Sequence, residues 1–229
     1  MKIEIWSDIA CPFCYIGKRH LEKALEIFSE KEHVEIIYRS FQLDPNAPKE
    51  SRENIYQQLA EKYAMSIEQA KATTAQIAEK AKAVGLDFHF ATLKPVNTAD
   101  AHRLLHFAKR FDLMPQMSER LFRAFFTESL NVAKHDVLIQ LAVDVGLDAE
   151  QTAIMLNGND YANEVEQDQR IARAYDISSV PFFLFNEKYA IAGAQPISVF
   201  TEALTNAKDE EKQAEKLNGA NCSDGSCSV

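Results

Sequence analysis

Four cysteines are the residues of this sequence whose type and spacing could do chemistry. They form two close pairs, Cys11 with Cys14 near the start of the chain and Cys222 with Cys227 near its end. Paired thiols can exchange electrons with a disulfide, or they can bind a metal ion such as zinc. In a reducing compartment such pairs are more often redox-active or metal-binding than structural.

The first pair lies where a predicted strand gives way to a predicted helix. Residues 2–6 alternate in hydrophobicity, and from Pro12 onward apolar residues recur at helical spacing. Pro12 suits the first position of a helix, where its missing N–H costs nothing. The free N–H groups and the dipole at a helix start stabilise a thiolate. We therefore expect Cys11 to be the attacking nucleophile and Cys14 to resolve the mixed disulfide.

A metal site is the alternative for these cysteines. C-x-x-C is also a metal-ligand spacing, and Cys222 and Cys227 could complete a four-thiolate zinc site. A strand-to-helix junction is more typical of the redox motif, so we expect no metal. His102 and His106 are four residues apart but lack a nearby third ligand, and we expect them to be packing or surface histidines.

The elements that must position the cysteines begin with a β-α-β unit. Residues 34–41 are typical of a second strand, so this unit is complete before residue 50. From about 50 to 157 the strand signal nearly disappears and helix caps take over, such as Ser66 with Gln69. This composition predicts an all-helical insert, interrupted by an aromatic loop over residues 86–90.

Strand character returns in the last third of the chain. After a helix over about 160–175, strands are predicted at 181–185 and 188–192 with a turn at Asn186-Glu187, before a last helix that ends near Leu217. The predicted order is β-α-β, helical insert, α-β-β-α, which is an α/β class. The predicted division is a discontinuous α/β domain of residues 1–49 plus 158–217, a helical insertion domain of residues 50–157, and a flexible, cysteine-containing tail of residues 218–229.

Composition narrows the classes of partner. The chain has 25 basic and 34 acidic residues and a net charge of −9, so it lacks the basic surface that nucleic acid binding requires. Its longest apolar stretch, residues 180–185, is far shorter than the roughly 18 residues of a membrane span. The first residues carry charge and lack a signal-peptide core, so we expect a cytoplasmic location.

Four segments resemble the DsbA-family, FrnE-like oxidoreductases. They are CPFCYIGK at 11–18, FQLDP at 41–45, NTADAHRL at 97–104 and VPFF at 180–183, and the resemblance covers about residues 1–205. It implies a thioredoxin-like fold with a helical insert and a catalytic pair of Cys11 and Cys14. It also implies a second redox pair near the chain end, to which Cys222 and Cys227 are similar. For such an enzyme we expect no organic cofactor.

The resemblance also implies a substrate surface beside the cysteines. In thioredoxin-like folds a cis-proline begins the strand after the linking helix, and Pro181 has this place in the sequence. A cis bond there would leave the backbone of Val180 free to pair with an extended substrate. Pro12 and Phe13 are expected to complete this surface.

Four further residues are candidates for a groove over the cysteines. They are Asn97 and Thr98, and the aromatic residues Phe88 and Phe90. Each pair has a simpler explanation. Asn97 and Thr98 are typical helix caps, and the aromatic residues could instead seal the joint between the two domains.

These observations predict a cytoplasmic thiol–disulfide oxidoreductase or isomerase that acts on protein or small-molecule disulfides and thiols. One alternative is a glutathione-dependent enzyme of the 2-hydroxychromene-2-carboxylate isomerase or kappa-class transferase type, with glutathione as co-substrate. Those enzymes typically have serine where this chain has Cys11. A second alternative is a non-enzymatic, metal-binding or chaperone-like module.

The C-terminal pair generates a first prediction, that it exchanges electrons with the first pair. From Leu217 the chain extends at most about 17 Å to Cys222 and about 33 Å to Cys227, at about 3.3 Å per residue, so contact within one molecule is allowed. In Cys14→Ser, mass spectrometry should find Cys11 disulfide-linked to Cys222 or Cys227. Removing residues 218–229 should lower turnover. If no such species forms and truncation changes nothing, the pair has no catalytic role.

Overall fold

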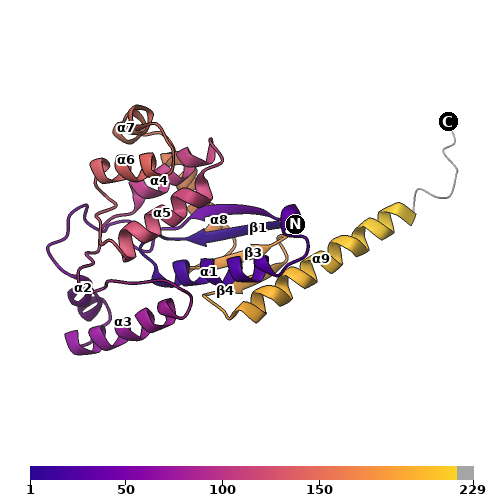
Figure 1. Cartoon of the computed structure of the whole chain (residues 1–229), viewed down its shortest axis with the longest axis horizontal. Coiled ribbons are helices and arrows are strands. Elements are labelled where there is room, and N and C mark those ends of the chain that lie inside the picture. The colour runs from indigo at the N-terminus through magenta and orange to yellow at the C-terminus, as the bar shows by residue number, and fades with distance from the viewer. Residues whose placement is uncertain (221–229) are drawn as a thin grey trace.

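The computed structural model describes residues 1–220 of the chain (Figure 1). Its elements are β1 Lys2–Ser7, α1 Pro12–Glu26, the short 3-10 helix η1 Lys31–His33, β2 Glu35–Ser40, α2 Ile55–Lys62, α3 Ile67–Lys82, α4 Ala99–Lys109, α5 Met114–Phe126, α6 His135–Asp144, α7 Ala149–Asn157, α8 Ala162–Ala174, β3 Phe182–Phe185, β4 Tyr189–Ala192 and α9 Ile197–Ala220. The predicted order of β-α-β, helical insert and α-β-β-α is confirmed. No helix in the described part of the chain is long and apolar enough to cross a membrane.

The four strands form one mixed sheet in the order β2-β1-β3-β4. β1 is parallel to β2 and antiparallel to β3, with Ile5 opposite Phe183. β3 and β4 form the predicted hairpin, and Asn186 and Glu187 in its turn have positive φ angles of 48° and 59°. The parallel pair requires a crossover, which α1 supplies.

Helices cover both faces of this sheet. On one face Ile3, Ile5 and Phe183 form a buried core with residues of α1 and α9. On the other face Trp6 is buried with residues of α8, and its indole N–H donates to the carbonyl oxygen of Asp168 at 3.2 Å. Side chains of β1 therefore point alternately to the two faces of the sheet, as the alternating hydrophobicity of its sequence predicts.

The helical insert lies at one end of the sheet, with α4 to α7 grouped together and α2 and α3 beside them (Figure 1). Its apolar residues form one continuous core with the first turns of α1, including Cys11, Cys14 and Tyr15. The helix α2 begins with a reciprocal capping box of Asn54 and Gln57, a signal that the sequence carries but that was not among the predicted caps.

The last helix is longer than predicted. α9 continues to Ala220 rather than ending near Leu217. The residues around this point are rich in lysine, glutamate and alanine, which favour helix, and one asparagine-glycine step does not outweigh them. Cys222 and Cys227 lie outside the described residues.

The helix that carries the cysteines is joined to the insert by a cluster of charges around Glu119 of α5. The Tyr15 hydroxyl donates to Glu119 at 2.5 Å, the Lys18 ammonium donates to it at 2.7 Å, and Arg19 also pairs with it. Burial alone would raise the pKa of Glu119, but the hydrogen bonds and charges of Arg19 and Lys18 lower it to about 2. Glu119 therefore remains ionised and holds α5 against α1.

This cluster generates a second prediction. Glu119→Gln should lower the free energy of unfolding at pH 7 by about 1–3 kcal/mol, because Lys18 is then left largely buried without one of its partners. A carboxylate with a lowered pKa stabilises the fold above its unfolded pKa, and this contribution is lost as the pH falls. The difference between the two proteins should thus shrink between the ordinary pKa of 4.5 and about 2.

Urea unfolding across this pH range measures the effect. Glu166→Gln is the matched control, since Glu166 makes an exposed pair with Arg170 on α8 and should change stability by less than about 0.5 kcal/mol. A difference for Glu119→Gln that is independent of pH would contradict the assignment.

Candidate active site

The two cysteines lie at the turn between β1 and α1. Cys11 is the N-cap residue of α1, Pro12 is at its first position, and the backbone N–H of Cys14 donates to the carbonyl oxygen of Cys11 at 3.1 Å. Both cysteines are free thiols, 4% and 2% exposed respectively. The predicted helix start is therefore confirmed, and both sulfur atoms belong to its first turn.

The two thiols have different surroundings. Cys11 lines a cavity of about 510 Å³, whereas Cys14 does not. Burial raises the pKa of the Cys14 thiol well above its ordinary value, and the neighbouring Cys11 sulfur raises it further. Cys14 therefore remains protonated near neutral pH, and Cys11 is the thiol that a molecule in the cavity meets.

The residues just before β3 also lie at this turn. The Val180–Pro181 peptide bond is cis, as expected from the resemblance, and the Cys11 thiol lies 3.6 Å from the carbonyl oxygen of Val180. Gly17 of α1 permits this approach, because a Cβ there would lie only 3.1 Å from Pro181 Cγ and from the Phe183 ring. The glycine thus lets α1 pack closely against the start of β3.

A buried carboxylate holds the turn together. Asp8 accepts hydrogen bonds from the backbone N–H groups of Ala10 at 3.3 Å and Leu43 at 2.8 Å, and it pairs with His102 at 3.4 Å. Its backbone carbonyl oxygen accepts from the N–H of Cys11 at 3.1 Å. Burial would raise the pKa of Asp8, but the hydrogen bond and charge of His102 and the Leu43 N–H lower it below its ordinary value.

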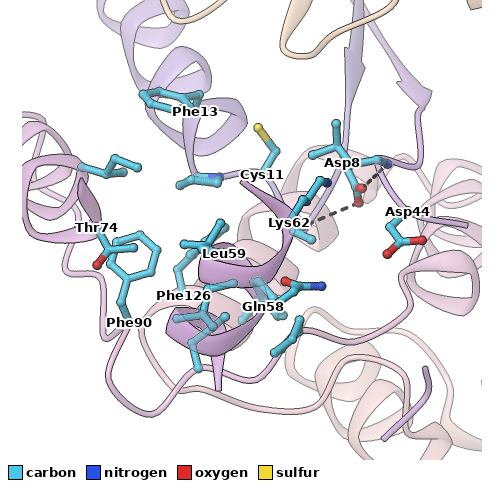
Figure 2. A pocket seen from close by; sticks show the side chains of 18 of the residues that line it. Asp8, Cys11, Phe13, Asp44, Gln58, Leu59, Lys62, Thr74, Phe90 and Phe126 are labelled. Atoms are coloured by element: carbon cyan, nitrogen blue, oxygen red, sulfur yellow. Dashed lines mark hydrogen bonds between the residues drawn. The ribbon is translucent and has the colours of Figure 1, made fainter. Parts of the chain in front are cut away.

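Figure 2 shows the cavity that opens beside Cys11. Cys11 and Phe13, from the start of α1, lie on one side of it, and Leu59, Phe90 and Phe126 lie on the other. These residues come from α1, α2, the loop before α4, and α5, so the cavity lies between the α/β part and the insert. Phe13 is 37% exposed and marks its rim.

Only some of the residues predicted for the groove line the cavity. Thr98 and Phe90 line the cavity, together with Pro12, Phe13 and Val180. Phe88 lies behind it and stacks on Tyr15 and Phe126, with ring centroids 5.9 and 4.6 Å apart. Asn97, rather than Thr98, makes the capping bond of α4, accepting from the N–H of Ala99 at 2.8 Å.

The two histidines of α4 have structural partners. His102 is 1% exposed and pairs with Asp8, as described above, while His106 lies 3.1 Å from Asp168 of α8. Among the side chains that the structure describes, which end at residue 213, no three histidine, cysteine or acidic groups lie together so that they could hold a metal ion.

Sequence reasoning missed Asp8 and most of the cavity wall. Asp8 precedes Cys11 by three residues in the same strand-to-helix loop, so its position was a usable signal. Leu59 of α2 and Ile77 of α3 are half-buried apolar helix residues, and only the packing of the insert brings them near Cys11.

Comparisons with known proteins agree with this geometry. The family model of the DSBA-like thioredoxin domain matches residues 2–205. A probable DsbA oxidoreductase from Streptomyces coelicolor is 41% identical, with a TM-score of 0.88 over 92% of this chain and 91% of that one. The uncharacterized protein YwbO of Bacillus subtilis (strain 168) is 30% identical over an alignment of 222 positions, which covers 92% of this chain and 98% of YwbO.

A more distant structure shares the fold alone. A 2-hydroxychromene-2-carboxylate isomerase is 13% identical, with a TM-score of 0.65 over 97% of this chain and all of that one. The thioredoxin-like sheet with its inserted helices, the cysteine pair at the start of α1 and the family match over residues 2–205 lead to one conclusion: the chain belongs to the DSBA-like thioredoxin domain family.

Proposed function

We propose that this protein is a thiol–disulfide oxidoreductase in which Cys11 attacks the substrate disulfide and Cys14 resolves the mixed disulfide. The observation that carries the proposal is the unequal environment of the two thiols. Cys11 lines the cavity at the start of α1, and Cys14 lies behind it with a raised pKa. The relative from Streptomyces coelicolor, named a probable DsbA oxidoreductase, supports the same reaction class.

The reaction exchanges two electrons in two steps. The Cys11 thiolate attacks one sulfur of the substrate disulfide, forms a mixed disulfide and releases the other sulfur as a thiolate. Cys14 then loses its proton and attacks the Cys11 sulfur, which closes the Cys11–Cys14 disulfide and releases the second thiolate. The two thiol protons of the enzyme balance the two product thiols. The reverse sequence oxidises a dithiol substrate.

The residues around the pair prepare these steps. The helix dipole and free N–H groups at the start of α1 stabilise negative charge at its N-cap. Asp8 and His102 are already paired with each other, so they hold the turn in place. The high pKa of Cys14 keeps it from competing with Cys11 for the substrate.

Selective alkylation generates a third prediction. A short pulse of iodoacetamide at pH 6 should label Cys11 before Cys14, because Cys11 is reached through the cavity and Cys14 is buried and protonated. Peptide mass mapping measures the order. Faster labelling of Cys14 would reverse the assigned roles.

Single-turnover oxidation generates a fourth prediction. Reduced protein is mixed with insulin or with hydroxyethyl disulfide, quenched in acid and mapped by mass spectrometry. The unmodified chain should form the Cys11–Cys14 disulfide, Cys14→Ser should stop at a mixed disulfide on Cys11, and Cys11→Ser should not react at this site. Ala149→Ser, at an exposed position of α7, is the control and should behave as the unmodified chain. Equal reaction of Cys11→Ser would exclude the proposal.

A further inference from the structure

The cavity beside Cys11 has the size and the walls of a small-molecule site. Its volume of about 510 Å³ lies within the roughly 300–1,000 Å³ of ligand pockets. The wall is formed mainly by apolar side chains from the insert: Leu59, Ile77, Phe90, Leu93, Val96 and Phe126. A nucleophilic thiol therefore borders an apolar chamber of drug-molecule size.

The charged groups of the described cavity wall are engaged elsewhere or lie at its mouth. Asp8 is hydrogen-bonded to His102 and to two backbone N–H groups. Asp44 and Lys62 are exposed. The hydroxyl of Thr74 donates to the carbonyl oxygen of Ala70 within its own helix, at 2.9 Å. The interior consequently offers little to compensate a buried charge, which would cost several kcal/mol if unpaired.

These walls discriminate between classes of disulfide. An extended polypeptide inside the chamber would need partners for its backbone N–H and C=O groups, and the apolar wall supplies few of them beyond Val180. Glutathione disulfide carries carboxylates and ammonium groups that would have to remain at the mouth. An uncharged ring system has neither requirement and gains free energy by leaving water. Asp44 and Lys62 are exposed at the mouth of the cavity. The other half of such a disulfide can therefore be polar and remain in solvent there.

We propose, on the basis of the function proposed above, that the cavity binds the apolar ring group of a small-molecule disulfide and presents its S–S bond to Cys11. Cys11 bonds to one substrate sulfur as the S–S bond breaks, and the other sulfur leaves as a thiolate. Cys14 displaces the remaining half. Two electrons pass from the cysteine pair to the substrate, and the two protons of the pair appear on the two product thiols.

Binding is tested without any redox step by using naphthylmethyl methyl sulfide, a thioether that cannot react. In the reduced, unmodified chain it should slow alkylation of Cys11, while the polar thioether methylthioethanol should not. This measurement needs no substitution, so it cannot fail through misfolding. Absence of protection by the naphthyl compound would overturn the proposal.

Substitutions then locate the bound ring. Ile77→Trp and Leu59→Trp, on two different helices of the wall, should each weaken thioether binding in calorimetry by about tenfold or more, because the indole fills the chamber. Ile154→Trp is the control at an exposed position of α7, and it should bind as the unmodified chain does. Unchanged binding in both wall variants, with circular dichroism showing the native fold, would place the ligand elsewhere.

Turnover separates this proposal from the proposed function. Naphthylmethyl hydroxyethyl disulfide, hydroxyethyl disulfide and glutathione disulfide are compared in single-turnover oxidation, and the first should have a rate constant about tenfold or more above the others. If all three react with similar rate constants, the function stands and the substrate class is wrong. If glutathione disulfide reacts fastest, a peptide thiol is the substrate. If none reacts with Cys11 although the thioether binds, the function itself fails.

Discussion

The candidate active site depends on the hydrogen bonds that the buried carboxylate of Asp8 accepts. This carboxylate joins the turn before α1, the segment that follows β2 and the helix α4 through Ala10, Leu43 and His102. A carboxylate in this position is costly to bury unless it is paired and hydrogen-bonded. Its partners meet that requirement, so the turn that carries Cys11 has a defined conformation before any substrate arrives.

Two further contacts fix the first half of α1 against its neighbours. Gly17 lets the helix approach Pro181 and Phe183 closely on the sheet side. On the opposite side Glu119 of α5 gathers Tyr15, Lys18 and Arg19. The first contact places Cys11 near the carbonyl oxygen of Val180, and the second holds the insert over the first turns of the helix.

The functional asymmetry of the cysteines follows from this packing. One face of the first turn of α1 meets the cavity, and there Cys11 is accessible to a bound molecule. The other face is covered, so Cys14 has a raised pKa, as the resolving role proposed for it requires. The insert therefore has more than a structural role in the proposed reaction, since it supplies most of the cavity wall beside Cys11.

The sequence by itself determined the cysteine pair, the helix start at Pro12 and the order of elements, because local periodicity and caps encode them. It also indicated the cis bond at Pro181 through resemblance. Only the tertiary structure decided that Phe90 lines the cavity while Phe88 lies behind it, and that Leu59 and Ile77 face a thiol so far from them in the chain. Burial and side-chain direction at such positions arise from contacts between distant segments, and the local sequence pattern of the insert does not specify them.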